Sequence, residues 1–240
     1  MIPETGFDRC LSFIHCELQP QKPGVAAYRG GHHRRAITIS RQTGSGGHVV
    51  AEKLAEYLQA HTPDESLPWT VFDRNLVEKV LSEHHLPSRL ARFMPEDRIP
   101  EVTDTIDELF GLHPPSWTLV RQTAETILHL AKVGNVILLG RGANVITRDL
   151  DYVFHVRLVG SIERRVRRLQ ELSQLSEAAA RALVGREDLG RRRYLRKYFN
   201  RDIDDPLLYH LVVNTDLVST QEAARIIGEA VMPVTTVVKA

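Results

Sequence analysis

The stretch that decides the fold is Ala36-Ile-Thr-Ile-Ser40-Arg41-Gln-Thr-Gly44-Ser45-Gly46-Gly47-His48, which leads directly into a helical pattern from Val49 to Leu58. A short β-branched run of this kind predicts a buried strand, and the glycines after it predict a tight turn into the helix. Such a turn aims backbone N–H groups and the positive end of a helix dipole at one point. The stretch therefore predicts a phosphate-binding loop.

The loop lacks two side chains that usually complete such a site. In a P-loop of the form G-x-x-x-x-G-K-[ST], the first glycine falls on Arg41, the lysine on Gly47 and the Ser/Thr on His48. Losing a lysine from the β- and γ-phosphates removes several kcal/mol of transition-state stabilisation unless another cation substitutes. Arg41 and His48 are the nearest candidates, whereas Lys53 lies about one and a half turns into the helix.

A dinucleotide-binding fingerprint is the nearest alternative for the same glycines. It requires a third glycine at the position that Val49 occupies after Gly44 and Gly46. Asp73 could act as the ribose-binding acid of such a site. That interpretation leaves an arginine-rich segment downstream without a role, so we favour the phosphate loop.

Strands and helices alternate from Ala36 onward. We predict strands over 36–40, 69–72, 135–139, 152–158 and 209–214, and helices over 46–60, 74–84, 116–133, 161–172, 176–201 (broken near Gly185 and Gly190) and 219–230. Apolar strands separated by helices predict a parallel sheet covered on both faces. Residues 1–35 are predicted to be a short helix and linker appended to this domain, and 86–115 a polar helical insertion.

Charge is concentrated in one segment. The 240-residue chain has a formal net charge of +1, which gives no overall bias toward nucleic acid. Residues 161–202, however, hold twelve Lys and Arg against six Asp and Glu. Phosphoryl transfer needs cations around the transferring group, so this segment predicts a mobile lid that carries arginines over phosphates. Solvated surface arginines are the alternative interpretation.

Two further motifs follow predicted strands, at the edge where open α/β sheets bind ligands. Arg141 stands between Gly140 and Gly142, and a guanidinium there offers a bidentate fork for phosphate. Asp73-Arg74 follows the second strand and could hold a ribose, a phosphate or a hydrated magnesium ion. A capping turn at the first motif and an N-cap role for Asp73 are the alternatives.

Cysteine usage and hydropathy indicate the compartment. Cys10 and Cys16 are too few for a disulfide framework and belong to no metal motif, as is typical of a reducing cytoplasm. The first residues lack a signal-peptide pattern, and no apolar run approaches the roughly 18 residues of a membrane span. We therefore expect a cytoplasmic protein without a membrane or nucleic-acid partner.

Taken together, these motifs resemble those of the bacterial cytidylate kinase-like proteins, a branch of the P-loop nucleoside monophosphate (NMP) kinases. The resemblance spans about residues 36–230. It is carried by Ile37-Thr-Ile-Ser-Arg41, the Gly44–Gly47 turn, Val71-Phe-Asp73-Arg74, Gly140-Arg141-Gly142-Ala143 and Tyr209-His-Leu-Val-Val-Asn-Thr215.

This resemblance implies a P-loop NMP-kinase-like α/β fold over 36–240, with an NMP-binding insertion at 86–115 and an arginine-rich lid at 161–202. It implies transfer of the ATP γ-phosphoryl, with Mg²⁺, to CMP, dCMP or a related nucleotide. By position, the residues that would hold ATP are Arg41, Gly44, Ser45, Gly46, Gly47 and His48. The acceptor side would hold Asp73, Arg74 and Arg141, and the catalytic arginines would be Arg141, Arg164, Arg168 and Arg191.

Two departures keep other functions open. True cytidylate kinases carry lysine where this chain has Gly47 and aspartate where it has Gly142, and the kinase-like branch shares the missing lysine. One alternative is a nucleotide-binding regulator that transfers weakly and docks on a protein partner through residues 1–35. Another is a kinase of a different small phosphate acceptor. The motifs assign no Mg²⁺ ligand.

Overall fold

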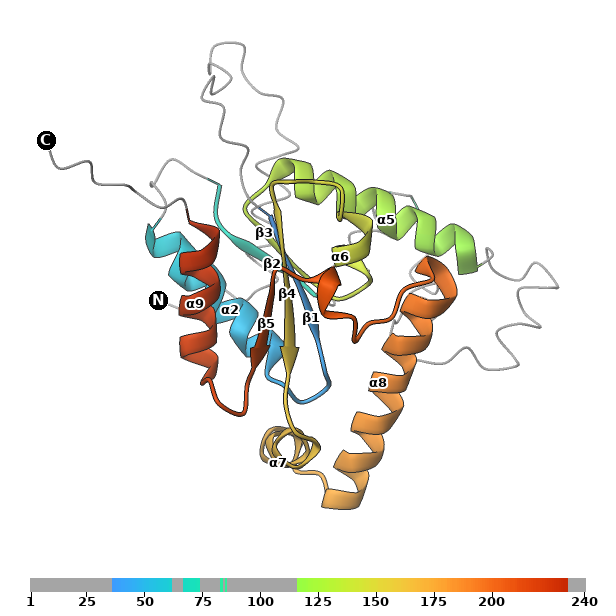
Figure 1. Cartoon of the computed structure of the whole chain (residues 1–240), viewed down its shortest axis with the longest axis vertical. Coiled ribbons are helices and arrows are strands. Elements are labelled where there is room, and N and C mark those ends of the chain that lie inside the picture. The colour runs from blue at the N-terminus through green and yellow to red at the C-terminus, as the bar shows by residue number, and fades with distance from the viewer. Residues whose placement is uncertain (1–35, 62–66, 74–82, 84, 86–115, 233–240) are drawn as a thin grey trace, which may run out of the picture.

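The computed structural model describes residues 36–61, 67–73, 83, 85 and 116–232. Its core is a parallel sheet of five strands in the order β2-β3-β1-β4-β5 (Figure 1). The strands are β1 (Ala36–Arg41), β2 (Thr70–Phe72), β3 (Val136–Leu139), β4 (Val153–Val159) and β5 (Leu211–Asn214). The described helices are α2 (Gly47–His61), α5 (Ser116–Val133), α6 (Ala143–Ile146), α7 (Ile162–Ser173), α8 (Glu177–Phe199), the short 3-10 helix η2 (Pro206–Leu208) and α9 (Thr220–Val231).

Helices cover both faces of the sheet, as the sequence predicts. On one face, Ile37 and Ile39 of β1 pack with buried residues of α2 and α9. On the other face, Ala36 and Leu138 pack with Ile127 of α5 and with α6 (Figure 1). Fully burying an aliphatic side chain of this size contributes about 2–3 kcal/mol, so these two layers fix the position of the central strand.

The carboxyl ends of the central strands meet at one edge because all the pairings are parallel. The N–H of Gly140, after β3, donates to the carbonyl of Ile39 at 3.0 Å, and the N–H of Gln42 donates to the carbonyl of Leu158 at 3.0 Å. The N–H of Gly160 in turn donates to Gln42 Oε1 at 3.0 Å. The turns after β1, β3 and β4 are thereby held side by side.

The face of the sheet that packs on α5 and α6 also carries buried polar side chains, on β1 and β4. Thr38 and Ser40 of β1 pair in register with His155 and Arg157 of β4. Thr38 Oγ1 lies 2.9 Å from His155 Nδ1, and Arg157 Nη1 donates to Ser40 Oγ at 2.8 Å. Burial, with a smaller contribution from His210, lowers the pKa of His155 to about 4 because the imidazolium loses its hydration. Buried polar strand positions therefore adjoin the site described below.

The predicted break in the long helix after residue 176 is wrong. Helix α8 runs unbroken through Gly185 and Gly190. A glycine costs a helix roughly 1 kcal/mol relative to alanine, which is less than the neighbouring packing supplies. Val184 packs against α7, and Arg191 and Leu195 are buried about two and three turns further on. Tertiary contacts on both sides of the glycines hold the helix together.

Other sequence predictions lie outside the described residues. These are the appendage at 1–35, nearly all of the helix at 74–84 and the insertion at 86–115. Two short elements appear where none was predicted, namely α6 after β3 and η2 before β5. Within the described part of the chain, no helix is both long and apolar enough to cross a bilayer.

Candidate functional site

The loop between β1 and α2 takes its shape from glycines. Gly44 and Gly46 have left-handed backbone, with φ of 79° and 83°, a region that glycine enters without steric cost. A Cβ on Gly44 would lie 2.5 Å from the carbonyl oxygen of Arg165, so no side chain fits there. The hydroxyl of Ser45 closes the turn by donating to the carbonyl of Gln42 at 2.7 Å.

Helix α2 begins directly after this turn, at Gly47. The first N–H groups of a helix have no intrahelical acceptor and carry the positive end of its dipole. In α2 they stand at the carboxyl end of the central strand, beside the turns after β3 and β4. This arrangement suits the phosphates of a nucleotide.

Two arginines of α7 donate hydrogen bonds to the loop. Arg165 Nη1 donates to the carbonyl of Thr43 at 3.0 Å, and its Nε donates to the carbonyl of Gly160 at 2.9 Å. Arg168 Nη1 donates to the carbonyl of Gly44 at 2.7 Å. The two arginines therefore fix the loop and bring positive charge beside it.

Two carboxylates of α8 accept hydrogen bonds from the same loop. Asp188 Oδ1 accepts the N–H of Thr43 at 2.7 Å, and Glu187 Oε2 accepts the Thr43 hydroxyl at 3.1 Å. Asp188 also pairs with Arg165 at 2.6 Å and with Arg191 at 3.5 Å. Arg191 in turn donates to the Thr43 hydroxyl and, at 3.2 Å, to Glu187. Thr43 is thus the point where α7 and α8 meet the loop.

A second cluster of charges joins the loop to the end of β2. Asp73 Oδ1 lies 3.9 Å from Arg41 Nη2, and Asp73 Oδ2 lies 3.4 Å from His48 Nδ1. His48 Nε2 also lies 3.1 Å from Glu52 on the outer surface of α2. Asp73, predicted on the acceptor side, therefore touches both cations that the sequence offered in place of the lysine.

The turn after β3 has left-handed backbone at three successive residues, of which only Arg141 is not a glycine. Gly140, Arg141 and Gly142 have φ of 84°, 58° and 68°. A Cβ on Gly142 would lie 2.7 Å from Cε2 of Phe199, the last residue of α8. The turn that carries Arg141 is therefore packed beneath the end of α8. A non-glycine residue with this backbone is uncommon and accumulates at functional sites.

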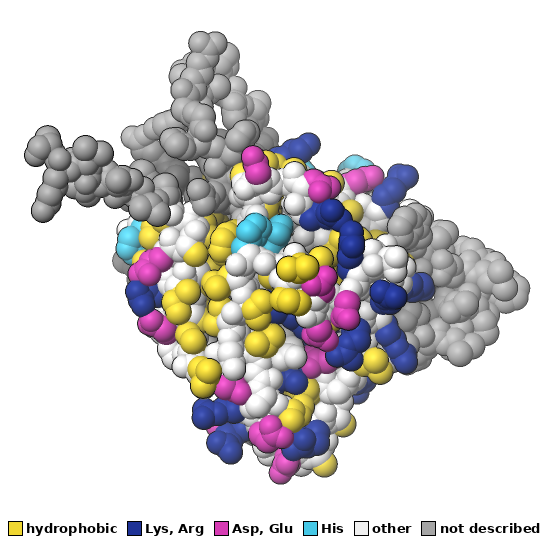
Figure 2. Space-filling model, viewed as in Figure 1, with side chains coloured by type: hydrophobic (Ala, Val, Ile, Leu, Met, Phe, Trp, Pro, Cys, Tyr) yellow, Lys and Arg dark blue, Asp and Glu magenta, His cyan; other side chains and the backbone are white. Residues whose placement is uncertain are grey.

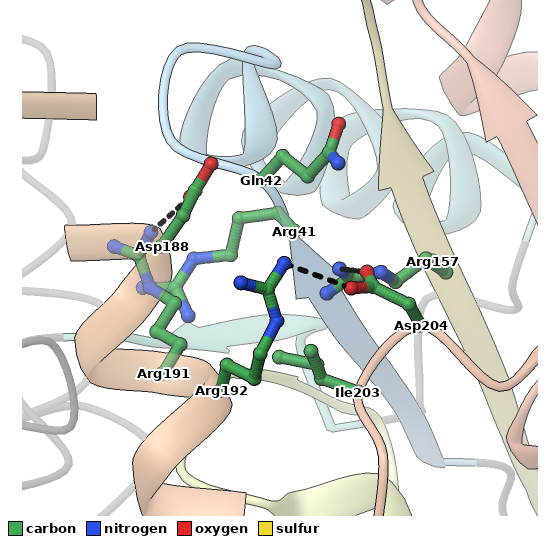
Figure 3. Close-up of a pocket in the computed structure, with 8 residues that line it drawn as sticks. All are labelled: Arg41, Gln42, Arg157, Asp188, Arg191, Arg192, Ile203 and Asp204. Atoms are coloured by element: carbon green, nitrogen blue, oxygen red, sulfur yellow. Dashed lines mark hydrogen bonds and ion pairs between the residues drawn. The ribbon is translucent and has the colours of Figure 1, made fainter. Parts of the chain in front are cut away.

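A polar pocket opens between the end of β1, α8 and the segment that precedes η2 (Figure 3). It holds about 230 Å³ of empty space, part of which is open to solvent. Asp204 joins two of its arginines, accepting from Arg157 at 2.8 Å and from Arg192 at 3.0 Å. Its lining is Arg41, Gln42, Arg157, Asp188, Arg191, Arg192, Ile203 and Asp204. With four arginines against two aspartates, the pocket favours an anion.

Basic and acidic side chains alternate over α7 and α8, as Figure 2 shows for the face in view. Arg164 is exposed, whereas Arg165 and Arg191 are buried against the loop. Of the predicted lid arginines, Arg168 and Arg191 contact the loop, and Arg164 is exposed to solvent. Arg74, predicted on the acceptor side, lies outside the described residues.

The described residues fit a nucleotide better than a dedicated metal cage. A glycine turn that leads into a helix N-terminus suits phosphate oxygens, which approach the backbone closely. Within the described segments, no group of three or more His, Cys, Asp or Glu could hold a metal ion. Magnesium in kinase sites keeps several waters and takes only one or two carboxylates beside substrate phosphates. Asp73, which lies beside Arg41 and His48, is a carboxylate that could take that role.

Comparison with known proteins identifies the family. The model of the cytidylate kinase-like family matches residues 36–217. The chain belongs to this family. The family match begins at the first residue of β1 and includes the loop, Asp73, Arg141 and the arginines of α7 and α8.

Individual relatives agree with the cytidylate kinase-like assignment. The cytidylate kinase of Pyrobaculum aerophilum is 30% identical over 79% of this chain and 89% of its own length. That of Pyrobaculum islandicum is 41% identical over 40% of this chain, and the chain spans about half (52%) of that relative. Among solved structures, an uncharacterized protein from Eubacterium ventriosum has a TM-score of 0.59 at 18% identity, covering 82% of this chain and 98% of that one. These findings confirm the P-loop NMP-kinase-like α/β fold.

Sequence reasoning overlooked part of the site of this cytidylate kinase-like chain. Arg165, Glu187 and Asp188 hold Thr43 in place, yet none was selected as a site residue. The available signal was spacing, because Arg165 stands three residues before Arg168, and Asp188 three before Arg191. What spacing could not supply was the side of each helix that meets the loop.

Proposed function

We propose that this chain is a nucleoside monophosphate kinase that transfers the γ-phosphoryl group of Mg-ATP to CMP or dCMP. The observation that carries the proposal is the glycine loop at the end of β1, enclosed by arginines of α7 and α8. Family membership supports a nucleotide kinase, and the relatives named cytidylate kinase support the choice of acceptor.

The reaction needs positioning and positive charge more than covalent help from the protein. A phosphate oxygen of the acceptor attacks the γ-phosphorus, the new P–O bond forms, and the bond to the β-phosphate breaks to release ADP. The attacking oxygen is already anionic, so the step needs no general base. Charge spreads over the γ-phosphoryl oxygens in the transition state, where cations stabilise it most.

Each part of the site has a place in this scheme. The N–H groups of the loop and of the first turn of α2 would hold the donor phosphates, and Asp73 would hold Mg²⁺, which would offset the negative charge of the phosphates. Arg141, after β3, would hold the acceptor phosphate. Arg168 and Arg191, which reach the loop from α7 and α8, would face the transferring group.

One observation favours a second candidate, a nucleotide-binding regulator with weak transfer. Asp188 accepts the N–H of Thr43, so a carboxylate stands at the loop in the described conformation. Incoming phosphates would have to displace or tolerate that charge. The docking function of residues 1–35 and a different phosphate acceptor both remain predictions, because their segments lie outside the described residues.

The test is ADP release from Mg-ATP with each NMP and dNMP in turn, with nucleotide affinity measured on the same preparation. We expect turnover with CMP or dCMP well above the rate without acceptor. Arg168→Ala should lower kcat/KM at least tenfold, whereas Arg167→Ala, one position along on the exposed side of α7, should stay within twofold. Binding without ADP release for any acceptor would refute the kinase and favour the regulator.

A further inference from the structure

The side chain of Arg41 occupies the space where a P-loop lysine would begin. In the P-loop register the lysine position is Gly47. A Cβ added to Gly47 would lie 2.9 Å from Cγ of Arg41, 3.2 Å from its Cβ and 3.5 Å from its Cδ. Carbon atoms pack at about 3.5–4.0 Å, so the two side chains exclude each other. The glycine at position 47 therefore leaves free the space that the side chain of Arg41 occupies.

The guanidinium of Arg41 stays at the mouth of the loop. Arg41 is the last residue of the central strand, and its side chain is only 15% exposed. Its Nη2 lies 3.9 Å from Asp73, which orients the charge toward the end of β2. Figure 3 shows its side chain directed into the polar pocket, with Asp188, Arg191 and Arg192 around it. A positive charge thus stands beside the N-terminus of α2 without coming from that helix.

The two other candidate side chains, His48 and Lys53, interact with residues away from position 47. His48 is 59% exposed and lies between Asp73 and Glu52 on the outer surface of α2. Lys53 Nζ donates to Gln221 of α9 at 2.9 Å, well along the helix from the loop. Neither shares space with residue 47. Only Arg41 among these three both contacts the Gly47 position and lines the pocket.

We propose that Arg41 replaces the missing P-loop lysine as the cation on the β- and γ-phosphates, and that Gly47 is the residue that makes room for it. The inference rests on the proposed function, because it assigns a residue to the same phosphate site. A guanidinium in that place presents two parallel N–H donors to phosphate oxygens, where an ammonium presents a point charge. In this chain the cation would come from Arg41 at the end of β1 and not from a lysine at the start of α2.

The test is a double-mutant cycle that restores the usual arrangement. Arg41→Ala removes the cation and should lower kcat/KM at least a hundredfold. Gly47→Lys alone should also lower it, because the lysine stem meets Arg41. The double variant R41A/G47K frees the space and returns a lysine, so it should exceed each single variant at least tenfold. Arg41→Gln keeps most of the side chain without the charge and replaces R41A if that variant unfolds. Lys53→Ala is the matched control, and its kcat/KM should stay within twofold of wild type.

Affinity for ATP, measured by calorimetry on the same variants, separates this inference from the proposed function. If the wild-type chain binds ATP without transferring a phosphoryl group, the kinase proposal fails. The role of Arg41 is then tested by the ATP affinity of its variants. R41A and R41Q should then weaken ATP binding at least tenfold, and R41A/G47K should regain affinity over R41A. The inference is overturned if folded R41A or R41Q keeps its ATP affinity within twofold, or if the folded double variant is no better than R41A.

Discussion

Removing the carboxylate of Asp188 should loosen the contacts of the loop with both α7 and α8. Asp188 accepts the N–H of Thr43 at 2.7 Å and pairs with Arg165 at 2.6 Å, and the Arg165 side chain is only 8% exposed. Removing one partner of a buried ion pair costs about 3–5 kcal/mol because the other charge stays buried. Asp188 is itself 20% exposed, so we take about 3 kcal/mol, the lower end of that range, for Asp188→Ala.

Two companion variants define the series. Asp188→Asn keeps an acceptor for the Thr43 N–H but loses the charge, so it should cost about 2 kcal/mol. Glu187→Ala removes a neighbouring carboxylate whose partners are the Thr43 hydroxyl and Arg191. It should cost only about 1 kcal/mol, because Arg191 keeps a second carboxylate, Asp188, at 3.5 Å. In a chain of this size 1 kcal/mol shifts Tm by about 2–4 °C, so Asp188→Ala should lower Tm by about 6–12 °C.

Thermal and urea unfolding of the four proteins provide the assay. The predicted order of destabilisation is Asp188→Ala, then Asp188→Asn, then Glu187→Ala. An Asp188→Ala variant that loses no more stability than Glu187→Ala would refute the reasoning, because Asp188 would then contribute no more than a carboxylate whose arginine keeps a second partner.

Three further predictions concern the sheet and the turns around the site. Since the folded pKa of His155 is about 4 against an unfolded value of 6.5, the unfolded chain binds the proton first as pH falls, and stability drops between pH 6.5 and 4. Urea unfolding at pH 7 and pH 5 should differ by about 2 kcal/mol from this group, and the same loss in His155→Gln would disprove it. Gly142→Ala should destabilise the fold because its Cβ meets Phe199, whereas Gly185→Ala, with open space in α8, should stabilise it by about 0.5–1 kcal/mol; equal Tm changes would contradict this. Arg141→Ala should lower kcat/KM at least tenfold with little change in Tm, and an unchanged kcat/KM would remove Arg141 from the site.

The sequence predicts the fold well because each signal is local. The apolar run from Ala36 to Ser40, followed by glycines, places β1, the loop and α2 within one residue of their observed bounds. The helix over 116–133 is reproduced at both ends. The exceptions are α6 and η2, which were not predicted, and the break predicted in α8, where glycine propensity was outweighed by the packing of Val184 and Leu195.

The site is less predictable because it depends on contacts between distant residues. Glycine spacing locates the loop, but the carboxylate on Thr43 comes from Asp188, 145 residues away in sequence. The overlap between Arg41 and the Gly47 position follows from the turn of the loop in space, which residue spacing does not give. The sequence motifs therefore predicted the phosphate loop and the arginine-rich segment. Only the three-dimensional contacts show which residues of that segment bind the loop.

Product analysis in a single turnover tests the central claim most directly. The full chain is mixed with a limiting amount of Mg-ATP and excess CMP, and both nucleotide diphosphates are quantified over time. If the loop and its arginines transfer a phosphoryl group, CDP and ADP appear at the same rate and in equal amounts. ADP without CDP, or ATP bound and left intact, would contradict the account.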